Sequence, residues 1–311
     1  MLQRSNSQGR LLKYKCLLVF VLTIQTFSFH TLAIVIRHDK ADQLHLATVK
    51  DFPPLATFYL DGAHGTLIRP QWVLTAAHTT FCLFPDSWID INQRLRQVKR
   101  IYVHPDHKTG VSHDVALIEL AEAATEVVPA RLYPDDDEVG QHIWFIGAGG
   151  TGHGNDGVTK DLVANRGQLR KAQNKVFAVA GPLLKFRFDA PPDALPLEGV
   201  SAGGDSGGPA YLVDKNQYFL LGISSRGDTG PVGFYGSVDV YTRVSFFVPW
   251  ALKLMDSAPR LRGQWSLDKL RTLPDGLTAD NLPEFCRQIG LKPERAGSSS
   301  VHRKGQPEAA S

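Results

Sequence analysis

Residues 203–209 read Gly203-Gly204-Asp205-Ser206-Gly207-Gly208-Pro209, and this is the most informative stretch of the chain. A serine flanked by glycines is typical of a tight turn that exposes its hydroxyl group, because glycine tolerates unusual backbone angles. In such a turn the N–H groups of Gly204 and Ser206 can face a single developing oxyanion. Ser206 is therefore a candidate nucleophile, although Gly-Asp-Ser-Gly also arises by chance in polar surface turns.

Two further segments supply the partners that a serine nucleophile needs. A base must take the hydroxyl proton, and a carboxylate must fix the tautomer of that base. His78 follows the apolar run Trp72-Val73-Leu74-Thr75-Ala76-Ala77, and Asp114 precedes the apolar run Val115-Ala116-Leu117-Ile118. The order His, Asp, Ser is that of the chymotrypsin arrangement, whereas subtilisin and the α/β-hydrolases use other orders. The three residues are therefore predicted to form a catalytic triad.

The remaining pattern predicts an all-β fold. Short runs rich in β-branched and aromatic residues are separated by clusters of Gly, Pro and Asp, at residues 56–60, 97–103, 143–146, 175–179, 185–188 and 218–221. Helical periodicity is found mainly over residues 245–255. The glycine-rich residues 147–157 lack a Gly-Lys-Ser/Thr element, so they indicate a surface loop rather than a phosphate site.

From about residue 34 to residue 256 the chain resembles the trypsin/chymotrypsin-like serine peptidases. Motifs that share the order and spacing of the family carry the resemblance: Gly65-Thr66-Leu67-Ile68, Thr75-Ala76-Ala77-His78, His113-Asp114-Val115-Ala116-Leu117, Leu169-Arg170-Lys171-Ala172, Gly204-Asp205-Ser206-Gly207-Gly208-Pro209, Gly222-Ile223-Ser224 and Val240-Tyr241-Thr242-Arg243-Val244. The resemblance implies two antiparallel six-stranded β-barrels with a C-terminal helix. It places His78 and Asp114 on the first barrel and Ser206 on the second.

The resemblance also implies an activity, the hydrolysis of peptide bonds through an acyl-enzyme. Ser206 would attack, His78 would carry the proton, Asp114 would orient His78, and the N–H groups of Gly204 and Ser206 would bind the oxyanion. Two alternatives stay open: a binding protein that has this fold without catalysis, and an esterase-type hydrolase. No cofactor is expected. No metal site is expected at His104, His107 and His113 either, because the sequence shows no carboxylate or cysteine at ligand spacing around them.

Four residues are candidates for the specificity pocket of such an enzyme. Val200 stands where trypsin has an aspartate at the base of the pocket, so a simple trypsin-like preference is not expected. Asp239 stands where the family usually has a small residue facing the same pocket, and its carboxylate could receive Lys or Arg. Arg226 could instead pair with Asp239 and cancel its charge. Ser224 resembles the family serine that supports the buried aspartate, and the alternative is an ordinary strand hydroxyl.

The N-terminus has the composition of a signal peptide over residues 1–33. Basic residues precede an apolar run from Cys16 to Phe29, and small residues end the segment at Ala33. The alternative is an uncleaved membrane anchor with the catalytic domain outside the cytoplasm. Cleavage after Ala33 would free an Ile34-Val35 terminus. By resemblance, its ammonium group would pair with Asp205, although Ile36 and Arg37 replace the glycines that usually follow.

Composition and cysteines complete the expectation of a secreted or periplasmic protein. A net charge of +3 argues against a nucleic-acid-binding surface, and 43% hydrophobic residues suffice for a large core. Once Cys16 is removed with the signal, Cys82 and Cys286 either form one disulfide or stay as thiols.

Residues 257–311 are expected to be an extension, helical in part and disordered from about residue 296. Substrate side-chain preference and oligomeric state are not predicted.

Overall fold

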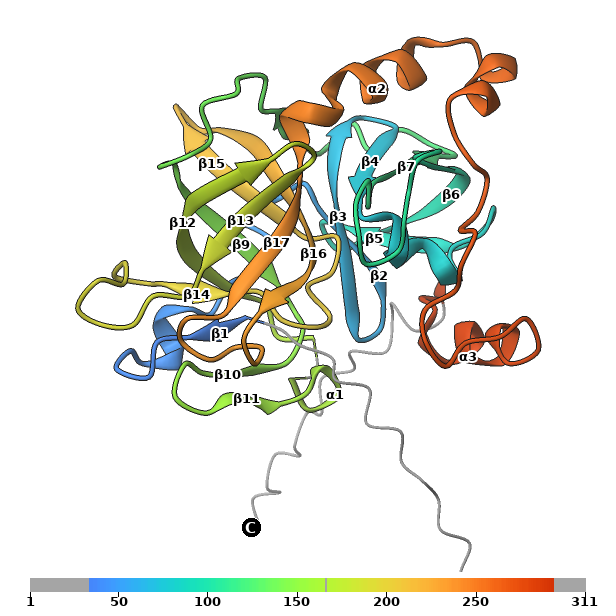
Figure 1. Ribbon diagram of the computed structural model, residues 1–311. Coiled ribbons are helices and arrows are strands. Elements are labelled where there is room, and N and C mark those ends of the chain that lie inside the picture. Colours follow the sequence, from blue (N-terminus) through green and yellow to red (C-terminus); the bar gives the residue numbers. More distant parts are fainter. Residues whose placement is uncertain (1–33, 166, 294–311) are drawn as a thin grey trace, which may run out of the picture.

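A computed structural model describes residues 34–165 and 167–293 of the chain. Figure 1 shows two β-barrels side by side, with a helix at the end of the second and a long C-terminal segment that runs over the first. The trypsin-like fold predicted from the sequence is confirmed. Residues 1–33, expected to be a signal peptide or anchor, and the tail that is expected to be disordered lie outside the described residues.

The first barrel is a closed sheet of antiparallel strands in the order β2-β3-β4-β7-β6-β5. Its strands are β2 (Leu55–Tyr59), β3 (Gly62–Arg69), β4 (Trp72–Thr75), β5 (Trp88–Ile91), β6 (Arg94–Val103) and β7 (Ala116–Leu120). Fully buried apolar side chains such as Phe58, Leu67 and Ile118 fill its interior. The 3-10 turn Ala77–Cys82 follows β4 directly, and Asp114 lies two residues before β7.

The second barrel closes in the order β15-β9-β12-β13-β17-β16, because β16 pairs back to β15. Its strands are β9 (His142–Gly147), β12 (Arg170–Ala180), β13 (Leu183–Arg187), β15 (Pro209–Asp214), β16 (Gln217–Thr229) and β17 (Val238–Arg243), with the short β8 (Arg131–Leu132) parallel to β16. Phe145, Phe186 and Tyr241 lie in its core. The turn that carries Ser206 enters β15, so Ser206 belongs to this barrel.

A smaller sheet lies beside the second barrel and contains the first described strand of the chain. Its order is β11-β10-β1-β14, with β1 (Val35–Ile36), β10 (Thr151–His153), β11 (Gly157–Lys160) and β14 (Gly199–Val200). The short helix α1 (Leu162–Asn165) follows β11. Ile34, Val35 and Ile36 are almost completely buried. The segment next to the expected cleavage point is therefore part of the packed structure.

Helix α2 (Val244–Asp256) packs its apolar face between the barrels, where Phe247 and Leu254 belong to one buried cluster with Trp72, Leu117 and Ile223. The extension then forms a 3-10 turn (Pro259–Gln264) and helix α3 (Leu282–Ile289). In Figure 1 it runs in orange and red from α2 down the outer side of the first barrel to α3. No helix within the described ranges is both long and apolar enough to cross a membrane.

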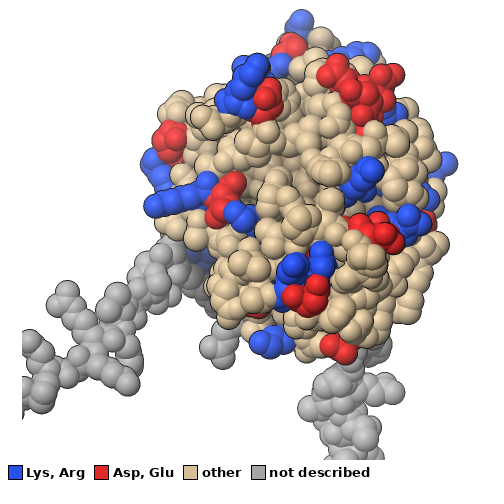
Figure 2. Space-filling view, turned by 90° about the vertical axis from the view of Figure 1, so that its left-hand side faces the viewer, with Lys and Arg blue, Asp and Glu red and all other residues tan. Residues whose placement is uncertain are grey.

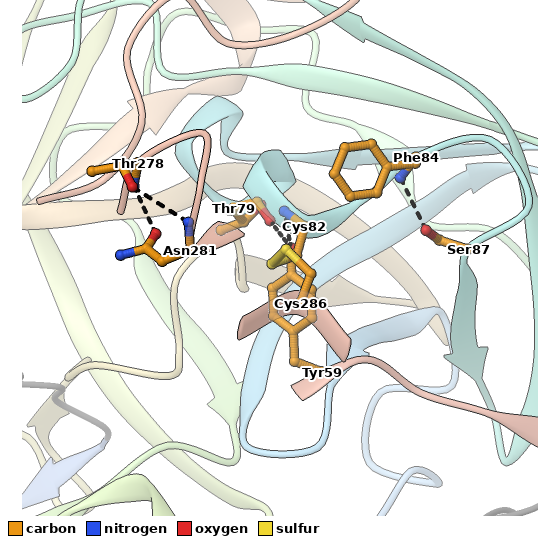
Figure 3. The surroundings of a disulfide bond; sticks show 8 residues. All are labelled: Tyr59, Thr79, Cys82, Phe84, Ser87, Thr278, Asn281 and Cys286. Atoms are coloured by element: carbon orange, nitrogen blue, oxygen red, sulfur yellow. Dashed lines mark hydrogen bonds between the residues drawn. A yellow bond between two sulfur atoms is a disulfide. The ribbon is translucent and has the colours of Figure 1, made fainter. Parts of the chain in front are cut away.

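The extension is tied to the first barrel by a disulfide. Cys82 and Cys286 are joined with their Cα atoms 5.2 Å apart, so the bridge, which the sequence left as one of two alternatives, is present. Figure 3 shows it beside Tyr59, whose hydroxyl donates to the carbonyl of Thr79 at 2.5 Å. The two cysteines are 204 residues apart in sequence. In the chain-entropy description such a long loop stabilises the fold by about 5 kcal/mol.

The surface carries mixed charge. On the face that Figure 2 shows, basic and acidic side chains lie interspersed among uncharged residues. Among the described residues several charged side chains are paired, as in Lys185 with Asp228 and Arg187 with Asp189. This distribution agrees with the small net charge of the sequence.

Candidate active site

The imidazole of His78 is held by Asp114. Nδ1 of His78 lies 2.7 Å from Oδ2 of Asp114, and the backbone N–H of His78 donates to Oδ1 at 2.9 Å. Burial favours the neutral imidazole, but the charge and hydrogen bond of Asp114 outweigh it and raise the pKa of His78. Burial would raise the pKa of Asp114, yet contact with His78 and Ser225 holds it well below its usual range. Since Nδ1 is engaged, Nε2 is the nitrogen left for proton transfer.

Ser225, in strand β16 of the second barrel, forms the hydrogen bond that supports the carboxylate of Asp114. Its hydroxyl donates to Oδ2 of Asp114 at 2.6 Å, while Ser224 places its hydroxyl 3.2 Å from that of Ser201. The assignment of this supporting role to Ser224 from the sequence is therefore wrong by one residue. Side chains alternate across a strand, so adjacent serines face opposite sides, and a motif ending at Ser224 could not decide between them.

The turn of Ser206 packs directly against the segment that carries His78. The backbone N–H of His64 donates to the carbonyl of Ser206 at 2.7 Å. Gly207 has a φ of +76°, and a Cβ there would lie 2.3 Å from Oγ1 of Thr75 and 3.2 Å from Cγ2 of Thr79. Only glycine allows this approach. The turn from β4 to the 3-10 segment therefore lies against the serine turn.

The amides expected to bind an oxyanion are available. Gly204 has a φ of +91°, a conformation that favours glycine, and its carbonyl accepts from Ala63 at 2.8 Å. Within the part of the chain that the structure describes, neither the N–H of Gly204 nor that of Ser206 donates a hydrogen bond. Two unpaired donors flanking a half-exposed serine can stabilise negative charge on a carbonyl oxygen.

The described hydrogen bonds include none between His78 and Ser206. In free enzymes this bond is often long and shortens only when the substrate binds. The structure thus joins His78, Asp114 and Ser225 directly, and it brings Ser206 to them through backbone packing at Gly207.

A buried carboxylate lies among the residues expected to form the specificity pocket. Oδ2 of Asp239 accepts hydrogen bonds from the backbone N–H of Ser201 at 2.9 Å and from its hydroxyl at 2.7 Å. Burial raises the pKa of Asp239 to about 7. Val200, next to Ser201, is completely buried in β14 and pairs with Val35. The sequence did not single out Ser201, although it directly follows Val200.

Arg226 does not neutralise Asp239. Its Nη2 donates to the carbonyl of Val111 at 3.0 Å, and in the sheet Arg226 pairs with Val240 while Asp239 pairs with Gly227. The alternative in which these two charges cancel is therefore not found. Asp239 has no cationic partner among the described residues.

Asp205 is a second buried carboxylate without a described cation. Its oxygens accept from the N–H groups of Ala202 at 3.0 Å and Gly149 at 3.2 Å, and burial raises its pKa to about 7. Val35 pairs with Val200 on one side and Gly152 on the other. Continuing both registers places the backbone of Ile34 beside Ser201 and Thr151, next to the segments that bind Asp205. Ile34 therefore lies beside Ser201, the neighbour of Ala202, whose N–H binds Asp205.

The structure adds a potential cluster of metal ligands that the sequence did not indicate. Asp106 joins His104 and His113, and one ligand atom from each lies within 4.8 Å of the others. The sequence showed no carboxylate at ligand spacing around the histidines, but the structure brings Asp106 close to two of them, and the N–H of Asp106 donates to Nδ1 of His104. Three such donors could hold a divalent cation. His107 lies apart, against Asp114.

His64 is another buried histidine that the sequence did not single out. It is completely buried, and burial lowers its pKa to about 4, so its imidazole is neutral. Nδ1 lies 3.2 Å from the hydroxyl of Thr57, and Nε2 accepts from the N–H of Ala148 at 3.1 Å. These contacts join the two barrels behind the serine turn, which is a structural role.

Comparison with known proteins agrees with this fold. The family model named Trypsin matches residues 43–251. A solved structure described as neuropsin, a serine protease expressed in the limbic system of mouse brain, aligns with a TM-score of 0.53. The alignment has 23% identity and covers 68% of this chain and 98% of that chain. Since the identity is low, this structure supports the fold alone.

Proposed function

The chain belongs to the trypsin family of serine proteases, and on that basis we propose that it is a secreted endopeptidase acting through Ser206, His78 and Asp114. The observation that carries the proposal is the connected set Ser225, Asp114 and His78, next to which the serine turn packs on Thr75 and Thr79. We assign residues 34–256 to the peptidase domain and residues 257–311 to an extension. The disulfide between Cys82 and Cys286 supports an oxidising compartment.

The proposed reaction is acyl transfer to water. Oγ of Ser206 attacks the peptide carbonyl while Nε2 of His78 takes its proton, and Asp114 stabilises the resulting imidazolium. The N–H groups of Gly204 and Ser206 bind the oxyanion. His78 then returns the proton to the leaving amine, which departs with the C-terminal part of the substrate. A water molecule, deprotonated by His78, releases the acyl group and restores Ser206.

The most direct test of this function is cleavage of a peptide library by the mature protein, with products identified by mass spectrometry. Cleavage within peptides, abolished in Ser206→Ala, would support an endopeptidase. Hydrolysis of ester substrates alone would favour the esterase alternative, and no hydrolysis of either class would favour the binding protein.

Activity is expected to fall on the acid side as His78 becomes protonated, because the base must be neutral to accept a proton. The pKa of His78 is raised, so this loss begins above the usual histidine pKa of about 6.5. The pH profile of kcat/KM for one good substrate measures it. A profile that is flat down to pH 5 would contradict the assignment of His78 as the base.

We propose that Asp239 receives a lysine or arginine side chain of the substrate. Its carboxylate is buried, lacks a described cation and is fixed by Ser201. Replacement by serine is expected to lower the ratio of kcat/KM for an Arg peptide over a Phe peptide about tenfold to hundredfold, because charged hydrogen bonds are lost. Asp228→Ser, which removes an exposed carboxylate, is the matched control. An unchanged ratio in Asp239→Ser would exclude the charged pocket.

We propose that cleavage after Ala33 also activates the protein, because a free ammonium group at Ile34 would supply the cation that Asp205 lacks. A single alanine inserted before Ile34 in the mature protein is expected to lower kcat/KM about a hundredfold, since it displaces one partner of a buried ion pair. Terminal sequencing of the exported protein locates the cleavage, and peptide hydrolysis measures the effect of the inserted alanine on kcat/KM. A mature protein that begins elsewhere and is fully active would refute this proposal.

A further inference from the structure

The loop between β6 and β7 brings two histidines and an aspartate together. It folds back on itself as a hairpin, because Lys108 and Ser112 exchange two backbone hydrogen bonds of 3.0 and 3.1 Å. The pairing places His104 and Asp106, on the outgoing limb, beside His113 on the returning limb. One ligand atom from each of the three side chains lies within 4.8 Å of the other two.

Helix α2 packs against both imidazole rings. The ring centroid of His104 lies 5.2 Å from that of Phe247 and 4.9 Å from that of Trp250, and the centroid of His113 lies 5.4 Å from that of Phe247. The two histidine rings are themselves 5.0 Å apart. They are therefore held side by side by the fold, so a cation that binds both loses little affinity to the ordering of side chains.

Each of the three side chains keeps a ligand atom for a cation. The carboxylate of the exposed Asp106 takes part in no salt bridge or hydrogen bond with another described residue. Nδ1 of His113 lies 3.0 Å from the hydroxyl of Ser112, which leaves Nε2 free, and Nε2 of His104 has no described partner either. Neither Nε2 atom is both buried and unpaired within the described chain, so both are accessible.

The chemistry of this set selects the cation. Ca²⁺ and Mg²⁺ prefer oxygen ligands, whereas imidazole and carboxylate together suit Zn²⁺. At Zn–N and Zn–O distances of about 2.1 Å, ligand atoms at tetrahedral angles lie about 3.4 Å apart. Small side-chain rotations therefore bring the three ligand atoms to bonding distance. At His104 the cation takes Nδ1 in place of the N–H of Asp106, or Nε2 once the ring proton moves to Nδ1.

We propose that His104, Asp106 and His113 bind one zinc ion, with water completing its coordination, and that the ion clamps the loop of residues 104–113. The next residue after His113 is Asp114, whose carboxylate holds His78. The ion would therefore restrain the segment that presents this carboxylate. The inference does not depend on the proposed peptidase function, because zinc binding and loop motion are measured without substrate.

Calorimetric titration of the metal-free mature protein with zinc tests the site. We expect one equivalent to bind, and Co²⁺ bound in its place to give visible absorption bands that zinc abolishes. Asp106→Ala, and His113→Asn, which tolerates the left-handed φ of +56° at this position, are expected to weaken binding by at least about tenfold, since losing a ligand costs no less than losing its supporting hydrogen bond. His142→Asn, which removes an exposed histidine of β9, is the matched control and should bind zinc like the wild type.

Binding of zinc at His78 is the main alternative, because 28% of that side chain is exposed. The equivalent is expected to remain in His78→Ala. Loss of the equivalent in His78→Ala but not in Asp106→Ala would overturn the proposal, and so would a wild type that binds no zinc. Thermal unfolding of the metal-free variants checks that they are folded. If His113→Asn is not, Asp106→Ala decides alone, because it removes an exposed side chain without a described partner.

Hydrogen exchange with and without zinc tests the clamp. The amides of residues 105–112 are expected to exchange severalfold more slowly in the zinc-loaded wild type, because opening the hairpin would break metal–ligand bonds. Asp106→Ala should show no such slowing at the same zinc concentration. If zinc binds to the wild type at these three residues but leaves the exchange of the loop unchanged, the ion is not a clamp and the inference is wrong.

Discussion

Replacing Ser206 by alanine is expected to lower kcat/KM for peptide hydrolysis at least a thousandfold while the protein stays folded. Without the hydroxyl no acyl-enzyme can form, and only oxyanion binding and substrate positioning remain to accelerate the reaction. Ser206 is half-exposed and its structural contact is made by its carbonyl, so the backbone and the packing at Gly207 are unchanged. Steady-state peptide hydrolysis by the wild type and the variant measures the loss of kcat/KM, and thermal unfolding of both proteins shows whether the variant stays folded.

The matched control is Ser257→Ala, which removes a serine hydroxyl bonded to the carbonyl of Lys253 at the end of α2. It is expected to leave kcat/KM within about twofold of the wild type. Retention of most activity in Ser206→Ala would show that another group is the nucleophile and would end the triad assignment.

Asp114→Asn is expected to reduce kcat by about ten-thousandfold near neutral pH. An amide in place of the carboxylate no longer stabilises the imidazolium, and it can donate to Nδ1, which stabilises the wrong tautomer of His78. Asparagine has nearly the same shape as aspartate, so the backbone contacts around His78 remain. Kinetics at several pH values measure the effect, and the acid limb of the profile should move to lower pH because the charge that raises the pKa of His78 is gone.

Ser225→Ala serves as the graded comparison. It removes one hydrogen bond to Asp114 but leaves the carboxylate on His78, so its effect on kcat should be far smaller than that of Asp114→Asn. If Asp114→Asn kept a kcat close to that of Ser225→Ala, Asp114 would have only a structural role.

The sequence was sufficient for the fold because its signals are local. The strands that flank His78 and Asp114 have apolar runs bounded by turn residues, and the glycines around Ser206 adopt the positive φ angles of a tight turn. These constraints depend on neighbouring residues along the chain. They are therefore visible without any knowledge of long-range contacts.

Features that depend on contacts between distant segments could not be predicted. The choice of Ser225 over Ser224 follows from which strand face meets Asp114, and the Val111 carbonyl that binds Arg226 comes from another loop. The path of residues 268–281 near His78 is held by the disulfide between Cys286 and Cys82. A sequence motif contains no information on these three contacts, so they emerge only from the structure.

The central claim, that His78 makes Ser206 a competent nucleophile, is tested most directly by labelling the mature protein with a fluorophosphonate and mapping the modified residue by mass spectrometry. Such probes react with an activated serine. We expect a single label on Ser206, at least a hundredfold slower to form in His78→Ala. Labelling at another residue, or an equal rate in His78→Ala, would contradict the claim.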